Sequence, residues 1–344
     1  MQRDAASTLS RDIQHAVNHS PLVHHAEIGA ANPFPPTGVV VRSRFEEAKF
    51  YRFGLHLGID NFRKNRLALG IRKTLGKITQ PINSYTRFPE YACMEESIRS
   101  FCDSRISQLP VEILDVGSPK CFGLFLASKQ SCTVEMTDIS PLNLDEYRTM
   151  WEPVRAQASG HVRFSLQDAR ALTHPEHSFD IVYSMSVIEH VSGEQGDSAA
   201  LSEMVRVLRP GGLLLFSVPF GSVYTEQWRK DFAGAVEEKN DGTFHFFQRI
   251  YDARALQTRL LTALTSIDIC SIWTVWRRSN LLVKALARLG QNLRGALGAI
   301  NPVLSSNVNQ CAPGIVEGIP TSYGEIHSPE DLCGDVIIAG RKCS

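Results

Sequence analysis

The feature that most constrains this chain is a short apolar run that passes through a glycine into a helix start. The run Ile113–Leu114 predicts a buried strand that ends at Asp115. Gly117 predicts a tight turn in which the backbone approaches another group closely. Ser118 followed by Pro119 is typical of a helix start, with a hydroxyl N-cap and a proline at the first helical position. Because a helix start presents free N–H groups and a positive dipole end, Asp115, Gly117 and Ser118 predict a small-ligand site at the carboxyl edge of a parallel sheet.

A second strand that ends in an acid narrows the class of ligand. Residues 134–137 predict this strand, and Asp138 follows it, 23 residues after Asp115. An acid at that spacing can accept hydrogen bonds from both hydroxyls of a ribose. NAD and S-adenosylmethionine both contain such a ribose, so the two aspartates leave both ligands open.

Three further segments complete the pattern. Residues 164–169 predict a third strand that ends in Asp168, which is placed to accept from an adenine amino group. Residues 178–191 predict a fourth strand with its helix. Residues 200–218 predict an amphipathic helix, a Pro-Gly-Gly turn and an apolar strand. In these residues, and most specifically in FDIVYSMSVIEHV and VLRPGGLLLFSVP, the chain resembles the class I S-adenosylmethionine-dependent methyltransferases.

The resemblance implies an α/β fold and a cofactor. The expected fold is a doubly wound, seven-stranded, mostly parallel sheet of the Rossmann-like methyltransferase type, with an N-terminal helical extension and an insertion before the last strand. The expected cofactor is S-adenosyl-L-methionine. Carried over position by position, the expected cofactor-binding residues are Asp115, Gly117, Ser118, Asp138, Ile139, Asp168, Ala169 and Ser184.

The chain departs from the family pattern in its first motif. Where the family usually has further glycines, this chain has Pro119 and Cys121. A dinucleotide needs those glycines because the backbone must close on its pyrophosphate. S-adenosylmethionine has no phosphate, so one glycine and a capped helix start suffice. The departure therefore weakens an NAD interpretation more than a methyltransferase interpretation.

Fewer residues are expected to act on the methyl acceptor than to bind the cofactor. Methyl transfer from a sulfonium is an in-line displacement, so the protein has to align the acceptor, exclude water and, for many acceptors, remove a proton. His190, just beyond the fourth strand, is the first candidate for a base, and His245, in the variable segment after the fifth strand, is the second. A Glu-His pair at positions 189 and 190 can equally be structural. Ubiquinone-type O-methyltransferases use a similar Glu-His pair to bind a metal together with an acid three positions earlier, but that position is Ser186 here, so no metal is expected.

The predicted function is S-adenosylmethionine-dependent methyl transfer to a small-molecule, glycan or lipid-linked acceptor, at oxygen. The alternative is a non-catalytic or regulatory protein that retains the S-adenosylmethionine-binding fold, which the reduced glycine motif permits.

The predicted organisation has five parts. Residues 1–41 are expected to be a disordered tail, because they are polar and end in a proline-rich stretch. A basic helical extension over 42–90 and the methyltransferase core over 91–275 follow. A basic insertion over 276–332 precedes the last core strand, at 333–344.

Charge is balanced overall but segregated along the chain. The 36 lysines and arginines equal the 36 aspartates and glutamates, so no global field attracts nucleic acid. However, residues 42–80 carry ten basic residues against three acids, and residues 270–316 carry five and no acid. Both segments could be helical caps with solvated basic faces. They could also contact a membrane surface or a lipid-linked acceptor.

Cysteine usage and hydropathy predict the compartment. The eight cysteines include no Cys-x-x-Cys pair, which argues against zinc and disulfide frameworks and suits a reducing cytosol. No apolar run reaches the roughly 20 residues of a membrane span. A cytoplasmic protein is therefore expected, with peripheral membrane contact as an open alternative.

Overall fold

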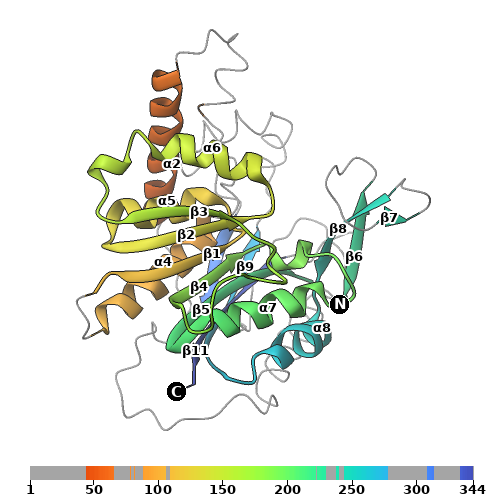
Figure 1. The fold of residues 1–344 in the computed structure, drawn as a ribbon. Coiled ribbons are helices and arrows are strands. Elements are labelled where there is room, and N and C mark those ends of the chain that lie inside the picture. Colours follow the sequence, from red (N-terminus) through yellow and green to blue (C-terminus); the bar gives the residue numbers. More distant parts are fainter. Residues whose placement is uncertain are drawn as a thin grey trace.

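The computed structural model describes residues 44–65, 78, 81, 88–105, 109–221, 223–229, 238–239, 244–277, 308–313 and 334–343 (Figure 1). Its main sheet has the strand order β10-β9-β11-β5-β4-β1-β2-β3. These strands are β1 (Val111–Val116), β2 (Cys132–Asp138), β3 (His161–Leu166), β4 (Phe179–Met185), β5 (Leu208–Phe220), β9 (Ile267–Arg277), β10 (Val308–Pro313) and β11 (Gly334–Lys342).

The topology of this sheet confirms the predicted fold class. Strands β3, β2, β1, β4 and β5 are mutually parallel, and β11 lies between β5 and β9, antiparallel to both. These seven strands form the doubly wound, mostly parallel Rossmann-like sheet. An eighth strand, β10, pairs antiparallel with β9 at the edge. The prolines at 302, 313 and 320 predict an irregular loop over residues 301–322. This prediction was wrong for β10, because a sheet edge can recruit a segment whose own sequence has no strand pattern.

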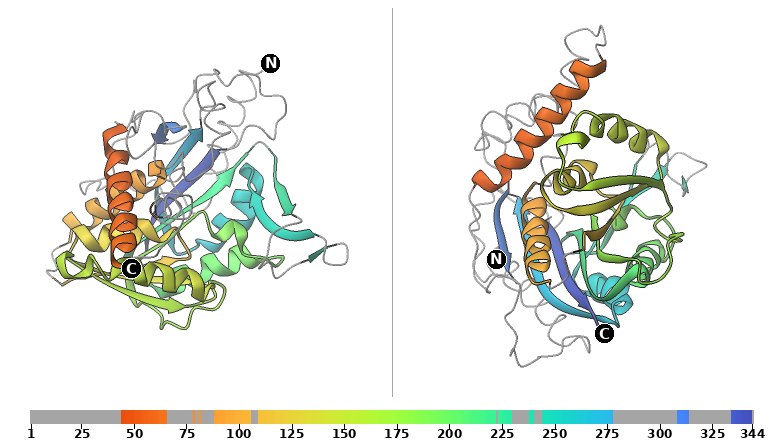
Figure 2. Two further views of the ribbon diagram at one scale, coloured as in Figure 1. Left: turned by 90° about the horizontal axis from the view of Figure 1, so that it is seen from above. Right: turned by 60° about the vertical axis from the view of Figure 1, so that its left-hand side comes forward.

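Helices cover both faces of the sheet (Figure 2). The described helices are α2 (Arg44–Asn65), α4 (Phe88–Asp103), α5 (Lys120–Lys129), α6 (Pro141–Trp151), η3 (Arg155–Gln157), η4 (Ile188–His190), α7 (Gly196–Val207), α8 (Ala253–Ala255), η5 (Leu256–Leu260) and η6 (Leu261–Ala263). One apolar core joins the sheet to α2, α4, α5 and α6, and a second joins it to α7 and the turns from α8 to η6. Parallel strands buried on both faces explain the nearly continuous apolar runs of β1, β4 and β5.

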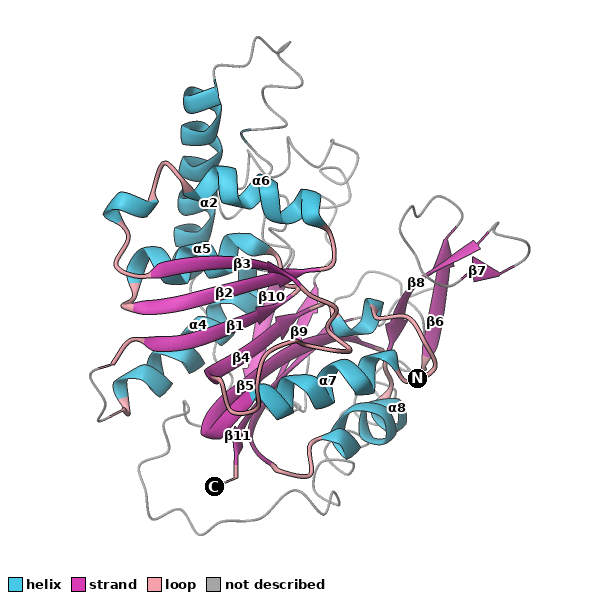
Figure 3. Cartoon of the chain, viewed as in Figure 1, coloured by secondary structure: helices cyan, strands magenta, loops and turns pink. Residues whose placement is uncertain are grey.

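A second, three-stranded antiparallel sheet follows β5 (Figure 3). Its order is β6-β8-β7, formed by β6 (Thr225–Arg229), β8 (Phe244–Ile250) and β7 (Glu238–Lys239). Residues 224–247 mix charged and aromatic side chains with no regular period, which predicts an irregular loop. This prediction was wrong for the three strands. The run Phe244-His-Phe-Phe does not alternate apolar and polar residues, so the period that identifies a strand is missing.

The first helix of the core begins differently from the sequence prediction. Helix α5 begins at Lys120, and Pro119 occupies the N-cap position with no side-chain capping bond. The Ser118 hydroxyl oxygen instead accepts from the backbone N–H of Met185 at 2.9 Å. The predicted serine N-cap was therefore wrong, because Ser118 joins the turn after β1 to the end of β4.

The cysteines also differ from expectation at one position. Cys93, on α4, is disulfide-bonded, although no disulfide was expected. The thiols of Cys121 and Cys132 are buried, and burial raises the pKa of each to about 12. These two cysteines are therefore unreactive core residues.

Two of the five predicted parts of the chain cannot be compared in full with the structure. Residues 1–41 and most of the 276–332 insertion lie outside the described residues, so the disordered tail and the basic insertion stay predictions. Among the helices that can be described, none is both long and apolar enough to cross a membrane.

Candidate active site

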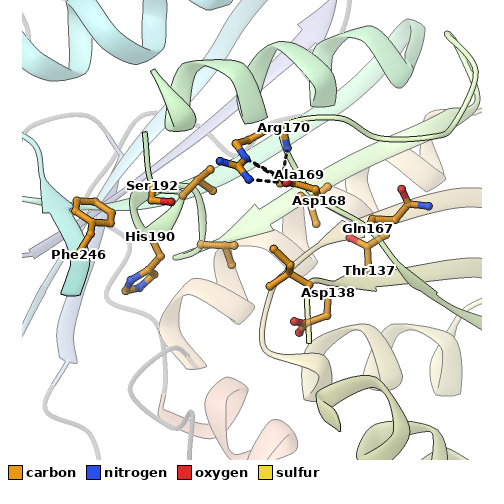
Figure 4. A pocket seen from close by; sticks show the side chains of 14 residues that line it. Thr137, Asp138, Gln167, Asp168, Ala169, Arg170, His190, Ser192 and Phe246 are labelled. Atoms are coloured by element: carbon orange, nitrogen blue, oxygen red, sulfur yellow. Dashed lines mark hydrogen bonds and ion pairs between the residues drawn. The ribbon is translucent and has the colours of Figure 1, made fainter. Parts of the chain in front are cut away.

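A cavity of about 190 Å³ opens at the carboxyl edge of the main sheet (Figure 4). Its walls come from the segments that follow β1, β2, β3 and β4 and from β8 of the second sheet. The cavity gathers six of the ten residues that the sequence singled out, namely Gly117, Asp138, Ile139, Asp168, Ala169 and His190. Parallel strands bring these residues together because their carboxyl ends meet at the same edge.

Gly117 lies where the cavity meets the turn after β1. Its φ of 72° falls in the left-handed region that L side chains rarely adopt. A Cβ added there would lie 2.6 Å from Cγ1 of Val187, which is closer than real Cβ contacts come. The turn therefore requires a residue without a side chain, and it leaves bare backbone beside the cavity, as close approach to a ligand needs.

Asp138 ends β2 and faces the same cavity (Figure 4). Its Oδ1 accepts from the backbone N–H of Ser140 at 2.9 Å, which holds the carboxylate in the turn before α6. Its Oδ2 accepts a long bond, 3.5 Å, from Nδ2 of Asn143. Since an ionised carboxylate has about four acceptor positions, capacity remains for the two hydroxyls of a ribose.

Asp168 is held by its neighbour Arg170. Arg170 Nε and Nη2 donate to Oδ1 and Oδ2 of Asp168 at 3.0 and 2.7 Å, and the Arg170 backbone N–H donates to Oδ1 at 2.9 Å. The hydrogen bonds from Arg170 lower the pKa of the Asp168 carboxyl, so it is ionised at neutral pH. The sequence indicated Asp168 but missed Arg170, which follows the strand with no distinguishing pattern.

Four predicted site residues do not line the cavity. Asp115 and Ser184 are completely buried, and the Ser184 hydroxyl donates to the Val116 carbonyl at 2.9 Å inside the sheet. Ser118 is engaged with β4 as described. His245 lies on β8 next to Phe246, and because successive strand residues point to opposite faces, the cavity-facing Phe246 places His245 on the other face.

Sequence reasoning also missed a buried lysine beside the two acids. Lys120 is 1% exposed, and its ammonium lies 3.6 Å from Oδ2 of Asp115 and 3.7 Å from Oδ2 of Asp138. Burial raises the pKa of the Asp115 carboxyl, while the charge of Lys120 and the N–H of Ser118 act in the opposite direction. A lysine at the start of a helix normally points into solvent, so no local signal identifies this one.

The tautomer of His190 follows from its hydrogen bond. Its Nδ1 lies 2.5 Å from the Phe247 carbonyl oxygen, which can only accept, so Nδ1 carries the proton. In the neutral ring Nε2 then carries the lone pair, and Nε2 lies 3.7 Å from Oε1 of the buried Glu189. The arrangement can take up a proton at Nε2, with Glu189 stabilising the resulting imidazolium. In the described part of the chain, no three His, Cys, Asp or Glu side chains gather as metal ligands would.

The wall around His190 is apolar. Val187, Val191 and Phe246 line the cavity together with His190. His190 and Phe246 lie across the cavity from Asp138 (Figure 4). Phe246 packs edge-on against Trp228 of β6 at 5.5 Å between ring centroids. The second sheet therefore supplies one wall of the site, which the sequence could not indicate because it predicted no strand there.

Part of the chain matches a known protein family. Residues 114–216 match the model of a protein family described as a methyltransferase domain. The matched segment runs from β1 into β5 and includes the segments after β1, β2, β3 and β4 that line the cavity. No curated protein sequence matches the chain.

Several solved structures are similar to this chain. The [4+2]-cyclase SpnF is 20% identical, with a TM-score of 0.44 over 72% of this chain and 82% of its own. An S-adenosylmethionine-dependent methyltransferase from Methanosarcina mazei is 17% identical, with a TM-score of 0.42 over 69% and 95%. The phosphoethanolamine N-methyltransferase 2 of Haemonchus contortus, in complex with S-adenosyl-L-methionine, is 18% identical, with a TM-score of 0.41 over 69% and 50%.

Proposed function

Residues 114–216 match a methyltransferase domain, and from this premise we propose that the cavity holds S-adenosylmethionine and that His190 assists methyl transfer to a hydroxyl of a small-molecule acceptor. The observation that carries the proposal is the meeting of Gly117, Asp138 and His190 around one cavity. Gly117 and Asp138 suit the binding of a nucleoside, and His190 suits the removal of a proton from the acceptor.

The residues present fit the cofactor. The bare backbone at Gly117 permits close approach of the ligand, and Asp138 retains acceptor capacity for the ribose hydroxyls. Asp168, Ala169 and Ile139 border the same cavity and would surround the adenine. When bound, the cofactor supplies a methyl group on a sulfonium that is already a good leaving group.

His190 is the residue proposed to hold the proton of the acceptor. Its Nδ1–H is engaged with the Phe247 carbonyl, so the ring keeps one orientation and one tautomer. In this tautomer Nε2 is the ring atom that carries the lone pair, and it is the atom proposed to accept a proton from a hydroxyl as that oxygen becomes the nucleophile. A hydroxyl needs such a base more than an unprotonated amine does, and this favours oxygen as the methylated atom.

The walls support an acceptor with an apolar body. Val187, Val191 and Phe246 would exclude water from the reacting atoms and pack against such a body. The acceptor is therefore proposed to be a small molecule with a hydroxyl on an apolar or aromatic framework.

The segregated charge supports a finer proposal, that the acceptor is lipid-linked and is met at an anionic membrane surface. Within the described residues two of the basic side chains are engaged with acids: Lys49 pairs with Glu95 at 2.7 Å and Arg63 with Asp60 at 3.7 Å. The remaining basic residues of 42–80 and 270–316 would have to make the surface contact.

The experiment that tests the proposed function joins binding to turnover. Isothermal titration calorimetry with S-adenosylhomocysteine and with NAD should show binding of the first alone. Transfer of a labelled methyl group should then be measured on phenols, polyols, amines and lipid-linked alcohols. Transfer to hydroxyl acceptors supports the proposal. Transfer to amines alone, or binding of NAD alone, would contradict it, and cofactor binding without any turnover would favour a non-catalytic protein.

A further inference from the structure

Lys120 is a charged side chain buried at the first position of α5. Its ammonium donates to the carbonyl oxygens of Ser118 at 2.8 Å and of Thr137 at 2.7 Å. These carbonyls belong to the turn after β1 and to the last residues of β2, so Lys120 links the two strand ends that border the cavity. A buried ammonium is costly unless it is paired and hydrogen-bonded, and here it is both.

Two carboxylates share this one cation. Lys120 Nζ lies at nearly equal distances from Oδ2 of Asp115 and Oδ2 of Asp138, 3.6 and 3.7 Å. The two acids differ in their surroundings, because Asp115 is sealed in the core whereas Asp138 lines the cavity. Two carboxylates around one site would repel each other and favour protonation, and a cation between them opposes both effects.

We propose that Lys120 is a positioning residue for cofactor binding, which holds the Asp138 carboxylate in the orientation that meets the ribose hydroxyls. The inference rests on the proposed function, since it takes Asp138 as the ribose acceptor. Lys120 stands between Pro119 and Cys121, the two residues that replace the later glycines of the motif. Lys120 thus provides a fixed charge beside the end of β2, in a chain whose first motif lacks the later glycines of the family pattern.

A purely structural role for Lys120 predicts something different. If Lys120 only neutralises the buried Asp115, its removal together with the charge of Asp115 should leave ligand binding intact. Asp115→Asn/Lys120→Gln tests this. It removes one negative and one positive charge, so the net charge of the three residues is unchanged, and the glutamine amide can still donate to carbonyl oxygens.

The experiment is calorimetric titration with S-adenosylhomocysteine, with circular dichroism to establish folding. At neutral pH the double variant should bind about tenfold more weakly than Asp115→Asn alone, as expected for a weakened charge-assisted contact. In an Asp138→Asn background, the Lys120 change should cause no further loss, because the carboxylate that Lys120 positions is absent there.

The outcomes separate the inference from the proposed function. Equal affinity of the double variant and Asp115→Asn would overturn the role of Lys120 while leaving the cofactor site intact. An unchanged affinity in Asp138→Asn alone would overturn the site itself. If the double variant does not fold, Lys120→Arg replaces it, measured alone and in the Asp138→Asn background. Any loss of affinity that it causes should disappear in that background, and an equal loss in both backgrounds would contradict the inference.

Discussion

Arg249 of β8 donates from Nη1 to the carbonyl oxygen of Val191 at 2.7 Å, which joins the second sheet to the segment that follows His190. Its Nη2 donates to the Gly193 carbonyl, and its Nε lies 3.8 Å from Oδ2 of Asp197 at the start of α7. The side chain is 1% exposed and packs on the ring of Phe246. Arg249 therefore fixes β8, which carries Phe246, relative to the segment that follows His190.

Replacement of Arg249 should loosen this connection. Arg249→Met leaves two part-buried carbonyls without their donor and the buried Asp197 without one of its cations, so we expect a loss of about 3–5 kcal/mol in the free energy of unfolding. Urea denaturation measures this loss, and Arg254→Met, at an exposed arginine of α8, is the matched control. Equal stability of the two variants would show that Arg249 does not hold the second sheet.

Replacement of His190 should separate catalysis from cofactor binding. His190→Gln removes the base, and we expect turnover on the acceptor to fall by about 10²-fold or more while affinity for S-adenosylhomocysteine changes little. His161→Gln, at an exposed histidine on β3, is the control and should retain activity. Undiminished turnover in His190→Gln would remove the proposed base. A fall in melting temperature with turnover preserved would support a structural role for the Glu189–His190 pair.

Replacement of Asp138 should weaken cofactor binding directly. Asp138→Ala removes the carboxylate proposed to accept from the ribose, and we expect a loss of about 1.5–3 kcal/mol in the binding free energy of S-adenosylhomocysteine. Asp145→Ala, at an exposed acid on α6 that pairs with Arg148, is the matched control. A folded Asp138→Ala protein that binds with wild-type affinity would place the nucleoside elsewhere.

Acid stability should depend on Asp197. Burial pushes the pKa of this carboxyl upward, but the hydrogen bond from Arg259 and the charge of Arg249 outweigh burial and hold the pKa below its usual value. Since the folded pKa is depressed, the stabilisation is fully present above the unfolded pKa and is lost as pH falls below about 4. Asp197→Asn should therefore be less stable than wild type at neutral pH, with a difference that shrinks on acidification. A difference independent of pH in urea denaturation would contradict this linkage.

The basic segments lead to a prediction about membrane surfaces. The full-length protein should sediment with vesicles that contain phosphatidylserine at low salt, and remain in solution at high salt, because exposed charges are screened. Changing Lys284 and Arg288 to Glu should abolish sedimentation, whereas vesicles of phosphatidylcholine alone should not bind in any condition. The absence of sedimentation at low salt would exclude the surface contact and leave these residues as solvated or internally paired charges.

Part of the site could be predicted from the sequence because its determinants are local. Apolar runs that end in Asp115, Asp138 and Asp168 identify parallel strands, and the spacing of the first two acids indicates a ribose. The carboxyl ends of parallel strands meet at one edge, so the sequence alone predicts that Gly117, Asp138 and Asp168 belong to one site. The fold class followed from the same order of strands and helices.

Only the tertiary structure decided between residues whose local sequence looks alike. His190 and His245 were both candidates, and the pairing of β8 with β6 and β7, together with the alternation of side chains along β8, brings Phe246 rather than His245 to the cavity. Local sequence likewise made Ser118 a cap and did not single out Lys120. In the fold, Ser118 bonds to β4 and Lys120 lies between two acids. The physical reason is that local sequence determines which segments become strands and helices, whereas burial and charge pairing depend on contacts between residues distant in the chain.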